Sequence, residues 1–290
     1  MMNMKPDMRY QSNHLKPLAG QVAWVTGSAR GIGRAIAEEL CRLSCKVAVH
    51  GLRSDDPKEL GAGESVQQVA DDIAAAYNGE TMAVWGDLAL ESEVKRIADD
   101  IRTRWRKVDI LVCCAGGNVG AKGVTFGQGG RPSNDDCLNI SLEDFHSVMD
   151  RNLMTAVLCC REVAPEMMER KAGRIITIGS TGGCVGYKSL CAYRVAKVAL
   201  HMYTRCLAEQ LRPYNIPVNC VALGSVASER WYVAYGGGKS EDRLIKDGTL
   251  ERVAQPHELA GVIGFLCTSA GGYISGQVIR FDAGEQRFPG

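Results

Sequence analysis

The sequence has no long hydrophobic run and no excess of charge of either sign. Its apolar stretches are all shorter than the roughly 20 residues that a membrane-spanning helix needs. The 290 residues include 34 lysines and arginines against 33 aspartates and glutamates, which gives a net charge of +1. Proteins that bind nucleic acid or anionic membranes usually carry basic clusters, so the charge balance argues against both kinds of partner.

The amino-terminal end lacks the apolar core and the cleavage site of a secretory signal. We therefore expect a flexible extension over residues 1–17 and a cytoplasmic location, where thiols stay reduced. The twelve cysteines lack the C-x-x-C and histidine spacing of a structural zinc site, and we expect neither a bound metal nor a disulfide framework. Cys113 and Cys114 are adjacent, but successive strand residues point to opposite faces, so we do not expect a metal or redox pair there.

Short apolar or β-branched runs alternate with longer helical stretches throughout the chain. The expected strands are 22–26, 46–51, 81–87, 109–116, 174–180, 216–222 and 277–282, and the expected helices are 31–43, 64–77, 91–105, 141–170, 191–212 and 256–268. This alternation predicts an α/β fold: a Rossmann-type doubly wound parallel sheet of about seven strands with helices on both faces. We expect a single domain over residues 18–290, because no repeat or linker divides it. An insertion at 117–140 and a candidate substrate lid at 224–250 follow strand ends, where ligands bind in such sheets.

A glycine-rich turn, VTGSARGIG at 25–33, lies between the first expected strand and the first expected helix. Gly27, Gly31 and Gly33 would let the backbone turn tightly and approach a pyrophosphate at the helix N-terminus. The spacing is G-x-x-x-G-x-G instead of the more familiar G-x-G-x-x-G. The position of the turn predicts a dinucleotide cofactor.

The end of the second strand indicates which nicotinamide cofactor is used. Sites for NAD carry an acidic residue about 20 positions beyond the glycines. Here Gly51 stands at that place, with Arg53 close by and Arg30 in the glycine-rich turn. Two guanidinium groups suit a 2′-phosphate, so we expect NADP(H) to be favoured over NAD(H). The alternative is that both arginines are ordinary surface charges; Asp55 and Asp56 are expected to lie beyond the strand in solvent.

A second motif, GSTGGCVGYKSLCAYRVAKVAL, occupies residues 179–200. Tyr193 and Lys197 are four residues apart on an expected helix and therefore share one face. A neighbouring ammonium favours the ionised form of a tyrosine, which suits Tyr193 to act as a general acid and base. Ser180 ends the fifth strand, where its hydroxyl could bind the reacting oxygen. The tyrosine–lysine spacing alone can arise by chance, but its combination with the glycine-rich turn predicts a hydride-transfer enzyme.

From about residue 18 to residue 285 the sequence resembles the short-chain dehydrogenases/reductases. TGSARGIG is similar to the family's cofactor fingerprint, and Ser180, Tyr193 and Lys197 match its catalytic serine, tyrosine and lysine. The resemblance implies that Tyr193 exchanges a proton with the substrate, that Lys197 also holds the nicotinamide ribose, and that Asn152 completes the proton relay. It implies cofactor contacts at Gly27, Ser28, Arg30, Gly31, Ile32, Gly33, Arg53, Asp87, Leu88, Ala115, Gly116, Tyr193, Lys197, Gly224 and Val226.

Several positions differ from the family pattern or allow a second interpretation. Cys113-Cys114 replaces two asparagines, Leu223-Gly224 replaces Pro-Gly, and Ser228 replaces a threonine. Without the resemblance, Asn152 and Asp87 would be interpreted as a mid-helix polar residue and a helix-start cap.

The two long segments contain the candidate substrate contacts. Gly182, Tyr187, Trp231 and Tyr232 would combine aromatic faces with hydrogen-bonding groups, which suits a sugar, a polyol or an oxygenated ring; the alternative is a pair of solvated loops. A 3-oxoacyl-carrier-protein reductase stays open as a second function, although only Lys171 of the two matching basic positions, 171 and 214, is basic. A non-catalytic NADP-binding regulator is a third function. The resemblance implies self-association as a homotetramer or a dimer.

Overall fold

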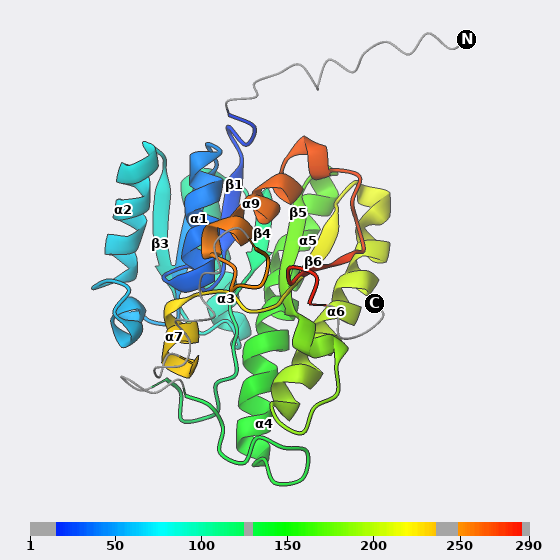
Figure 1. Ribbon diagram of the computed structural model, residues 1–290. Helices are drawn as coiled ribbons and strands as arrows, with labels where there is room; N and C mark the ends of the chain where they lie inside the picture. Colours follow the sequence, from blue (N-terminus) through cyan, green and yellow to red (C-terminus); the bar gives the residue numbers. More distant parts are fainter. Residues whose placement is uncertain (1–15, 125–129, 236–248, 286–290) are drawn as a thin grey trace.

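Seven strands form one parallel sheet in the order β3-β2-β1-β4-β5-β6-β7 (Figure 1). The computed structural model describes residues 16–124, 130–235 and 249–285. The strands are β1 (Val22–Val25), β2 (Lys46–Gly51), β3 (Thr81–Trp85), β4 (Ile110–Cys113), β5 (Arg174–Ser180), β6 (Val218–Leu223) and β7 (Val278–Phe281). The order reverses between β1 and β4, the kind of position where open α/β sheets bind ligands. The predicted fold class is therefore confirmed.

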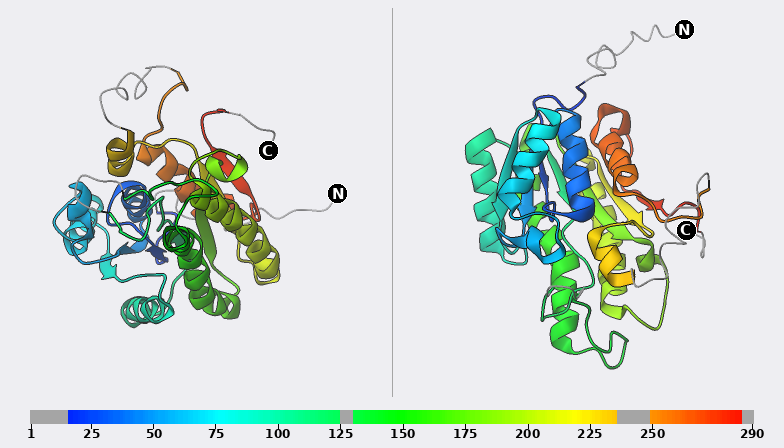
Figure 2. Two further views of the ribbon diagram at one scale, coloured as in Figure 1. Left: turned by 90° about the horizontal axis from the view of Figure 1, so that it is seen from below. Right: turned by 60° about the vertical axis from the view of Figure 1, so that its left-hand side comes forward.

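Helices cover both faces of the sheet (Figures 1 and 2). One face carries α1 (Gly31–Arg42), α2 (Val66–Tyr77) and α9 (Pro256–Cys267), and the other carries α3 (Glu91–Trp105), α5 (Thr155–Arg170) and α6 (Cys191–Leu211). The shorter elements are η2 (Asp56–Leu60), α4 (Leu142–Met149), η3 (Asp150–Met154), η4 (Thr181–Cys184), η5 (Arg212–Tyr214), α7 (Glu229–Tyr235) and η6 (Ser269–Gly271).

The pleat of each strand divides the core into two clusters. In β1, Ala23 and Val25 pack with α1, α2 and α9, whereas Val22 and Trp24 pack with α3, α5 and α6. All four side chains are at most 1% exposed. Near-continuous apolar strands are typical of a parallel sheet that is buried on both faces.

The helix expected over 141–170 runs without a gap from Leu142 to Arg170 but contains a π-helical turn. A π-helical turn, η3, separates α4 from α5, and Asn152 lies within it. The Asn152 side-chain amide donates to the Val148 carbonyl over 2.8 Å, so a side chain satisfies a backbone group of the preceding helix. The predicted helix is therefore confirmed, with a local change of helix type that was not predicted.

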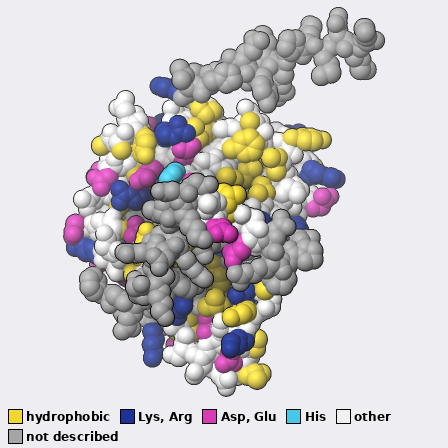
Figure 3. Space-filling model, viewed as in Figure 1, with side chains coloured by type: hydrophobic (Ala, Val, Ile, Leu, Met, Phe, Trp, Pro, Cys, Tyr) yellow, Lys and Arg dark blue, Asp and Glu magenta, His cyan; other side chains and the backbone are white. Residues whose placement is uncertain are grey.

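The predicted extension and long segments are only partly described. The Leu18 N–H donates to the Leu43 carbonyl over 3.1 Å, so the chain has joined the domain at that residue, whereas residues 1–15 lie outside the described part. Residues 125–129 of the insertion and 236–248 of the lid also lie outside it. No helix within the described ranges is both long enough and apolar enough to span a membrane. On the face drawn in Figure 3, acidic and basic side chains lie interspersed.

Candidate active site

A cavity of about 1600 Å³ opens at the carboxyl ends of the strands. Most of the predicted site residues line it: Gly27, Arg30, Gly31, Ile32, Gly33, Arg53, Asp87, Leu88, Ala115, Gly116, Ser180, Gly182, Tyr187, Tyr193, Lys197, Gly224, Val226 and Trp231. Three predicted residues are not among its lining: Ser28, Asn152 and Tyr232.

The glycine-rich turn passes close to the end of β4. A β-carbon on Gly27, whose φ is +62°, would lie 2.9 Å from the Ala115 Cα, and one on Gly33 would lie 2.2 Å from the Gly27 carbonyl oxygen. Both positions therefore require glycine. The turn leads into α1 at Gly31, and the start of this helix lines the cavity, which suits a pyrophosphate.

His50, which was not predicted as a site residue, holds this turn. Its Nδ1 atom accepts from the Gly27 N–H over 3.1 Å, and its Nε2 atom lies 3.1 Å from the Gly86 carbonyl. Burial lowers the pKa of His50 to about 4, so the ring is neutral and Nε2 carries the proton. The Ser28 hydroxyl accepts from the His50 N–H over 2.9 Å and donates to the Val25 carbonyl, which explains why Ser28 is buried behind the cavity wall.

Charged side chains from η2 surround the predicted 2′-phosphate site. Arg30 pairs with Asp56 and Glu59 at 3.3 and 3.2 Å, and Arg53 also pairs with Glu59. Asp56 is only 7% exposed and lines the cavity, so the expectation that it lies in solvent is wrong. The correction has a local cause: η2 folds back, and the Asp56 carboxylate accepts from the Leu52 N–H over 3.2 Å. The spacing of residues in the sequence does not show that the chain folds back at η2.

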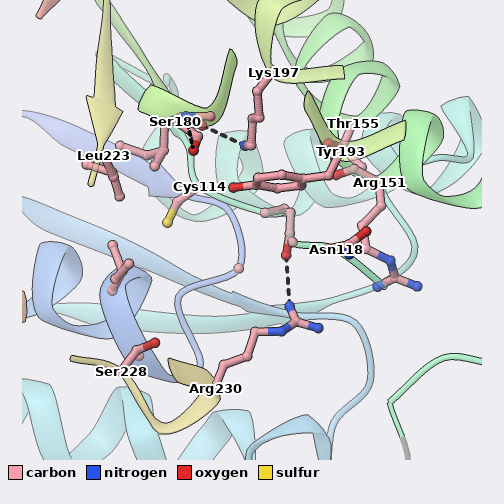
Figure 4. Close-up of a pocket in the computed structure, with 18 of the residues that line it drawn as sticks. Cys114, Asn118, Arg151, Thr155, Ser180, Tyr193, Lys197, Leu223, Ser228 and Arg230 are labelled. Atoms are coloured by element: carbon pink, nitrogen blue, oxygen red, sulfur yellow. Dashed lines mark hydrogen bonds between the residues drawn. The ribbon is translucent and has the colours of Figure 1, made fainter. Parts of the chain in front are cut away.

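Ser180, Tyr193 and Lys197 lie on one wall of the cavity (Figure 4). Lys197, 5% exposed, donates from Nζ to the Ile178 carbonyl over 2.8 Å, and Nζ is 5.7 Å from the centre of the Tyr193 ring. The Ser180 hydroxyl accepts from the Gly182 N–H over 3.1 Å. The end of β5 and one face of α6 therefore bring the predicted catalytic serine, tyrosine and lysine together.

Asn152 binds the backbone that follows β4. Its Oδ1 atom accepts from the Gly117 N–H over 2.8 Å, and its Nδ2 atom donates to the Gly117 carbonyl over 2.9 Å. A β-carbon on Gly116 would lie 2.8 Å from this Oδ1 atom and 3.4 Å from the Lys197 Nζ atom. Asn152 is therefore close to Lys197, but its side-chain polar atoms are engaged with backbone groups.

The two adjacent cysteines separate as expected. Cys113 is buried in the core on the α3, α5 and α6 face, whereas Cys114 packs toward the opposite cluster and lines the cavity. The Thr26 hydroxyl accepts from the N–H groups of Cys114 and Ala115, each over 2.9 Å. Thr26, which carried no predicted role, therefore fixes the strand end beside the glycine-rich turn.

The substrate side of the cavity combines aromatic and cationic groups. Tyr187 is 60% exposed, and the Arg194 guanidinium lies 5.3 Å from its ring centre. Trp231 lines the cavity and meets Tyr232 edge to face, while Tyr232 is 46% exposed and is not among the lining residues. Arg230, which belongs to the predicted lid segment 224–250, faces Tyr193 across the cavity in Figure 4 and donates to the Gly116 carbonyl over 3.3 Å. Burial lowers the pKa of Arg230 to about 10, which leaves it charged near neutral pH.

Comparisons with known proteins agree with this geometry. A family model described as enoyl-(acyl carrier protein) reductase matches residues 27–286. The chain is 32% identical over 275 residues to cyclohexanol dehydrogenase of Rhodococcus sp., covering 92% of this chain and 97% of that protein. It is 31% identical over 272 residues to a 3-oxoacyl-[acyl-carrier-protein] reductase of Synechocystis sp., covering 93% and 99%.

A solved structure gives the same result. The structure of 7α-hydroxysteroid dehydrogenase, complexed with NADH and 7-oxo glycochenodeoxycholic acid, matches 93% of this chain and 96% of its own with a TM-score of 0.79 at 26% identity. The fold, the family model and these relatives together show that the chain belongs to the short-chain dehydrogenase/reductase family of oxidoreductases.

Proposed function

We propose that the protein transfers a hydride between NADP(H) and the carbonyl or secondary alcohol of a small polar substrate, with Tyr193 as general acid and base. The observation that carries the proposal is the single cavity shared by the glycine-rich turn at one end and by Ser180, Tyr193 and Lys197 at the other. The nicotinamide cofactor, when bound, donates or accepts the hydride. The protein's own groups bind, orient and move the proton.

Each of the three side chains has a role that follows from its contacts. Tyr193 gives its phenolic proton to the substrate oxygen during reduction and takes it back during oxidation. The Lys197 ammonium, fixed on the Ile178 carbonyl, stabilises the negative charge that develops on the tyrosine oxygen. The Ser180 hydroxyl accepts from Gly182, so its own proton is available for the substrate oxygen.

The proposed preference for NADP(H) is supported by the region around Gly51. A β-carbon on this residue would lie 2.6 Å from Val66 Cγ2, so the position that is acidic in NAD sites cannot carry a side chain here. Arg30 and Arg53 both pair with Glu59. Arg30 also pairs with Asp56 and Arg53 with Asp55, so a 2′-phosphate would bind the two guanidinium groups by displacing the Glu59 carboxylate that they share.

The proposed substrate is a sugar, a polyol or an oxygenated ring. Tyr187 and Trp231 offer aromatic faces, and the charged Arg230 and Arg194 lie beside them on the cavity wall. A second candidate, reduction of a 3-oxoacyl group on a carrier protein, is favoured by the similarity to the Synechocystis enzyme. Assays with free polar ketones and with a 3-oxoacyl thioester distinguish the two substrates.

Replacement of the tyrosine tests the proposal. Tyr193→Phe removes the proton donor and keeps the ring, so turnover should fall by about 10²- to 10⁴-fold. The dissociation constant for NADPH, measured by fluorescence titration, should change by less than about threefold, because the glycine-rich turn is untouched. Turnover equal to the wild-type value would exclude Tyr193 as the acid and base. Cofactor binding without turnover of any tested substrate, by the wild type as well, would favour the non-catalytic alternative.

A further inference from the structure

Two thiols from distant parts of the sequence meet beside the cavity. The Sγ atom of Cys137 donates a hydrogen bond to the Sγ atom of Cys191 over 3.3 Å. Cys137 belongs to the segment 130–140, the end of the insertion, and Cys191 is the first residue of α6. Tyr193 follows two residues later. The pair therefore connects the insertion to the helix that carries the proposed acid and base.

The neighbouring contacts already hold the segment at this point. The Asp135 carboxylate accepts a hydrogen bond from the Asn118 amide over 2.7 Å, which fixes the segment against the residues that follow β4. Cys137 follows Asp135 by two residues, so this hydrogen bond also limits the position of the Cys137 sulfur. A bond between the two sulfurs would therefore make permanent a contact that the fold forms without it.

Accessibility distinguishes this pair from the other close pair of thiols. Cys137 is exposed and Cys191 is partly exposed. Cys113 and Cys160 also have their sulfurs 4.0 Å apart, but they are only 4% and 1% exposed in the core. A dissolved oxidant therefore reaches the first pair and not the second.

We propose that Cys137 and Cys191 are a redox modification site, at which a disulfide fastens the segment 130–140 to α6 and slows turnover. Both joined segments line the cavity, through Arg131 on one side and through Tyr193 and Lys197 of α6 on the other. Substrate entry and product release often need such walls to move, and a covalent link between them restricts that movement. The effect on turnover rests on the proposed oxidoreductase function, whereas formation of the disulfide does not.

The oxidant is a small disulfide such as oxidised glutathione. The thiolate of Cys137 attacks one of its sulfurs, forms a mixed disulfide and releases one glutathione, which takes up a proton. The Cys191 thiol then loses its proton and attacks the Cys137 sulfur, which forms the protein disulfide and releases the second glutathione. The two protein thiols lose two protons and two electrons, and the oxidised glutathione gains them.

The order of attack follows from the environment of each sulfur. Burial, and then the contact with Cys137, raise the pKa of the Cys191 thiol to about 11. Cys191 therefore stays protonated near neutral pH, and the exposed Cys137 reacts first.

The test treats the full-length protein with oxidised glutathione, blocks the remaining thiols under denaturing conditions and maps the peptides by mass spectrometry. We expect a linked pair of peptides through Cys137 and Cys191, with the loss of two hydrogens. The oxidised protein should show a kcat lower by about threefold or more, restored by dithiothreitol, with an unchanged dissociation constant for NADPH.

Two variants provide the comparison. Cys137→Ser should keep its kcat after treatment with oxidised glutathione. The kcat of Cys206→Ser should fall as that of the wild type does, because Cys206 is an exposed thiol of α6 that lies outside the pair. The proposed disulfide would be refuted if the thiols of Cys137 and Cys191 stayed reduced. It would also be refuted if Cys137 kept a bound glutathione and formed no bond to Cys191. A complete disulfide with unchanged kcat would overturn its effect on turnover. If no form of the protein were active, the proposed function would be refuted. The peptide map would still show whether the disulfide between Cys137 and Cys191 forms.

Discussion

His50 couples the stability of the cofactor end to protonation. Its ring is buried and neutral, with one nitrogen bonded to the Gly27 N–H and the other to the Gly86 carbonyl. The folded protein lowers its pKa from 6.5 to about 4, so the unfolded chain binds a proton in this interval and the folded chain does not. The stabilisation is therefore complete above about pH 6.5 and is lost as the pH falls toward 4.

We predict that His50→Gln reduces the loss of stability in acid. Between about pH 7 and about pH 5 the wild type should lose about 2 kcal/mol of its free energy of unfolding through this one residue, and the variant should not. Urea unfolding at both pH values measures the difference. His257→Gln is the matched control, because His257 is exposed on α9 and should leave the pH dependence as it is. The same pH dependence in His50→Gln as in the wild type would contradict the prediction.

Arg53 and Glu59 should have opposite effects on the choice of cofactor. Arg53→Ala removes one of the two guanidinium groups, so we expect NADPH binding to weaken by about tenfold and NADH binding by much less. Glu59→Gln removes the carboxylate with which a 2′-phosphate would compete, so NADPH binding should tighten relative to NADH. Fluorescence titrations with both cofactors measure the ratio. Equal losses for NADPH and NADH in Arg53→Ala would refute the proposed preference for NADP(H).

At the scale of elements, the join between β1 and α1 depends on the absence of a side chain. We predict that Gly33→Ala weakens cofactor binding by about tenfold and lowers the free energy of unfolding by about 1–3 kcal/mol, because the new methyl group meets the Gly27 carbonyl. Gly261→Ala in α9 is the control. Its added carbon would meet no atom within 4 Å beyond its chain neighbours and its own helix backbone, so this change should preserve binding and should not lower stability. If both variants behaved alike, close packing of the turn would not be the cause.

The elements that could be predicted from sequence are those whose signals are local. α2 is one example, since Ser65 accepts from the Gln68 N–H and caps a run with apolar residues at helical spacing. The π-helical turn inside the helix of residues 142–170 could not be predicted in the same way. Asn152 in this turn bonds to Gly117, a residue 35 positions earlier in the chain, which no local signal in the sequence shows.

The residues of the candidate site also differ in whether a local sequence signal reveals them. The glycine-rich turn and the pair Tyr193 and Lys197 are visible as spacings within one element or one turn. His50 is less visible, because its contact with Gly86 spans 36 positions and needs two strands to lie side by side. Arg230 appears in the sequence as one charge in a long segment, and only the fold buries it opposite Tyr193.

At the scale of the whole molecule, one face of α6 presents exposed apolar side chains among the described residues. Val195, Val198 and Met202 are 41%, 48% and 56% exposed and lie three and four residues apart, so they share a face. Leu142 on the neighbouring α4 is 75% exposed. Clusters of exposed apolar side chains of this kind are typical of protein interfaces. α6 also carries Tyr193 and Lys197, so packing on this face would support the proposed catalytic helix from behind.

We predict that this face joins copies of the chain into a dimer or a homotetramer. Light scattering coupled to size exclusion should give a mass of at least two chains for the wild type. The double variant Val198→Glu and Met202→Glu places two like charges on the face, and burying either charge unpaired is costly, so its mass should fall toward that of one chain. Tyr77→Glu on the distant α2 should leave the mass unchanged, since Tyr77 is 38% exposed on the other side of the sheet. Circular dichroism separates dissociation from unfolding. A wild type with the mass of one chain, or a folded double variant with the wild-type mass, would rule out this face as the interface.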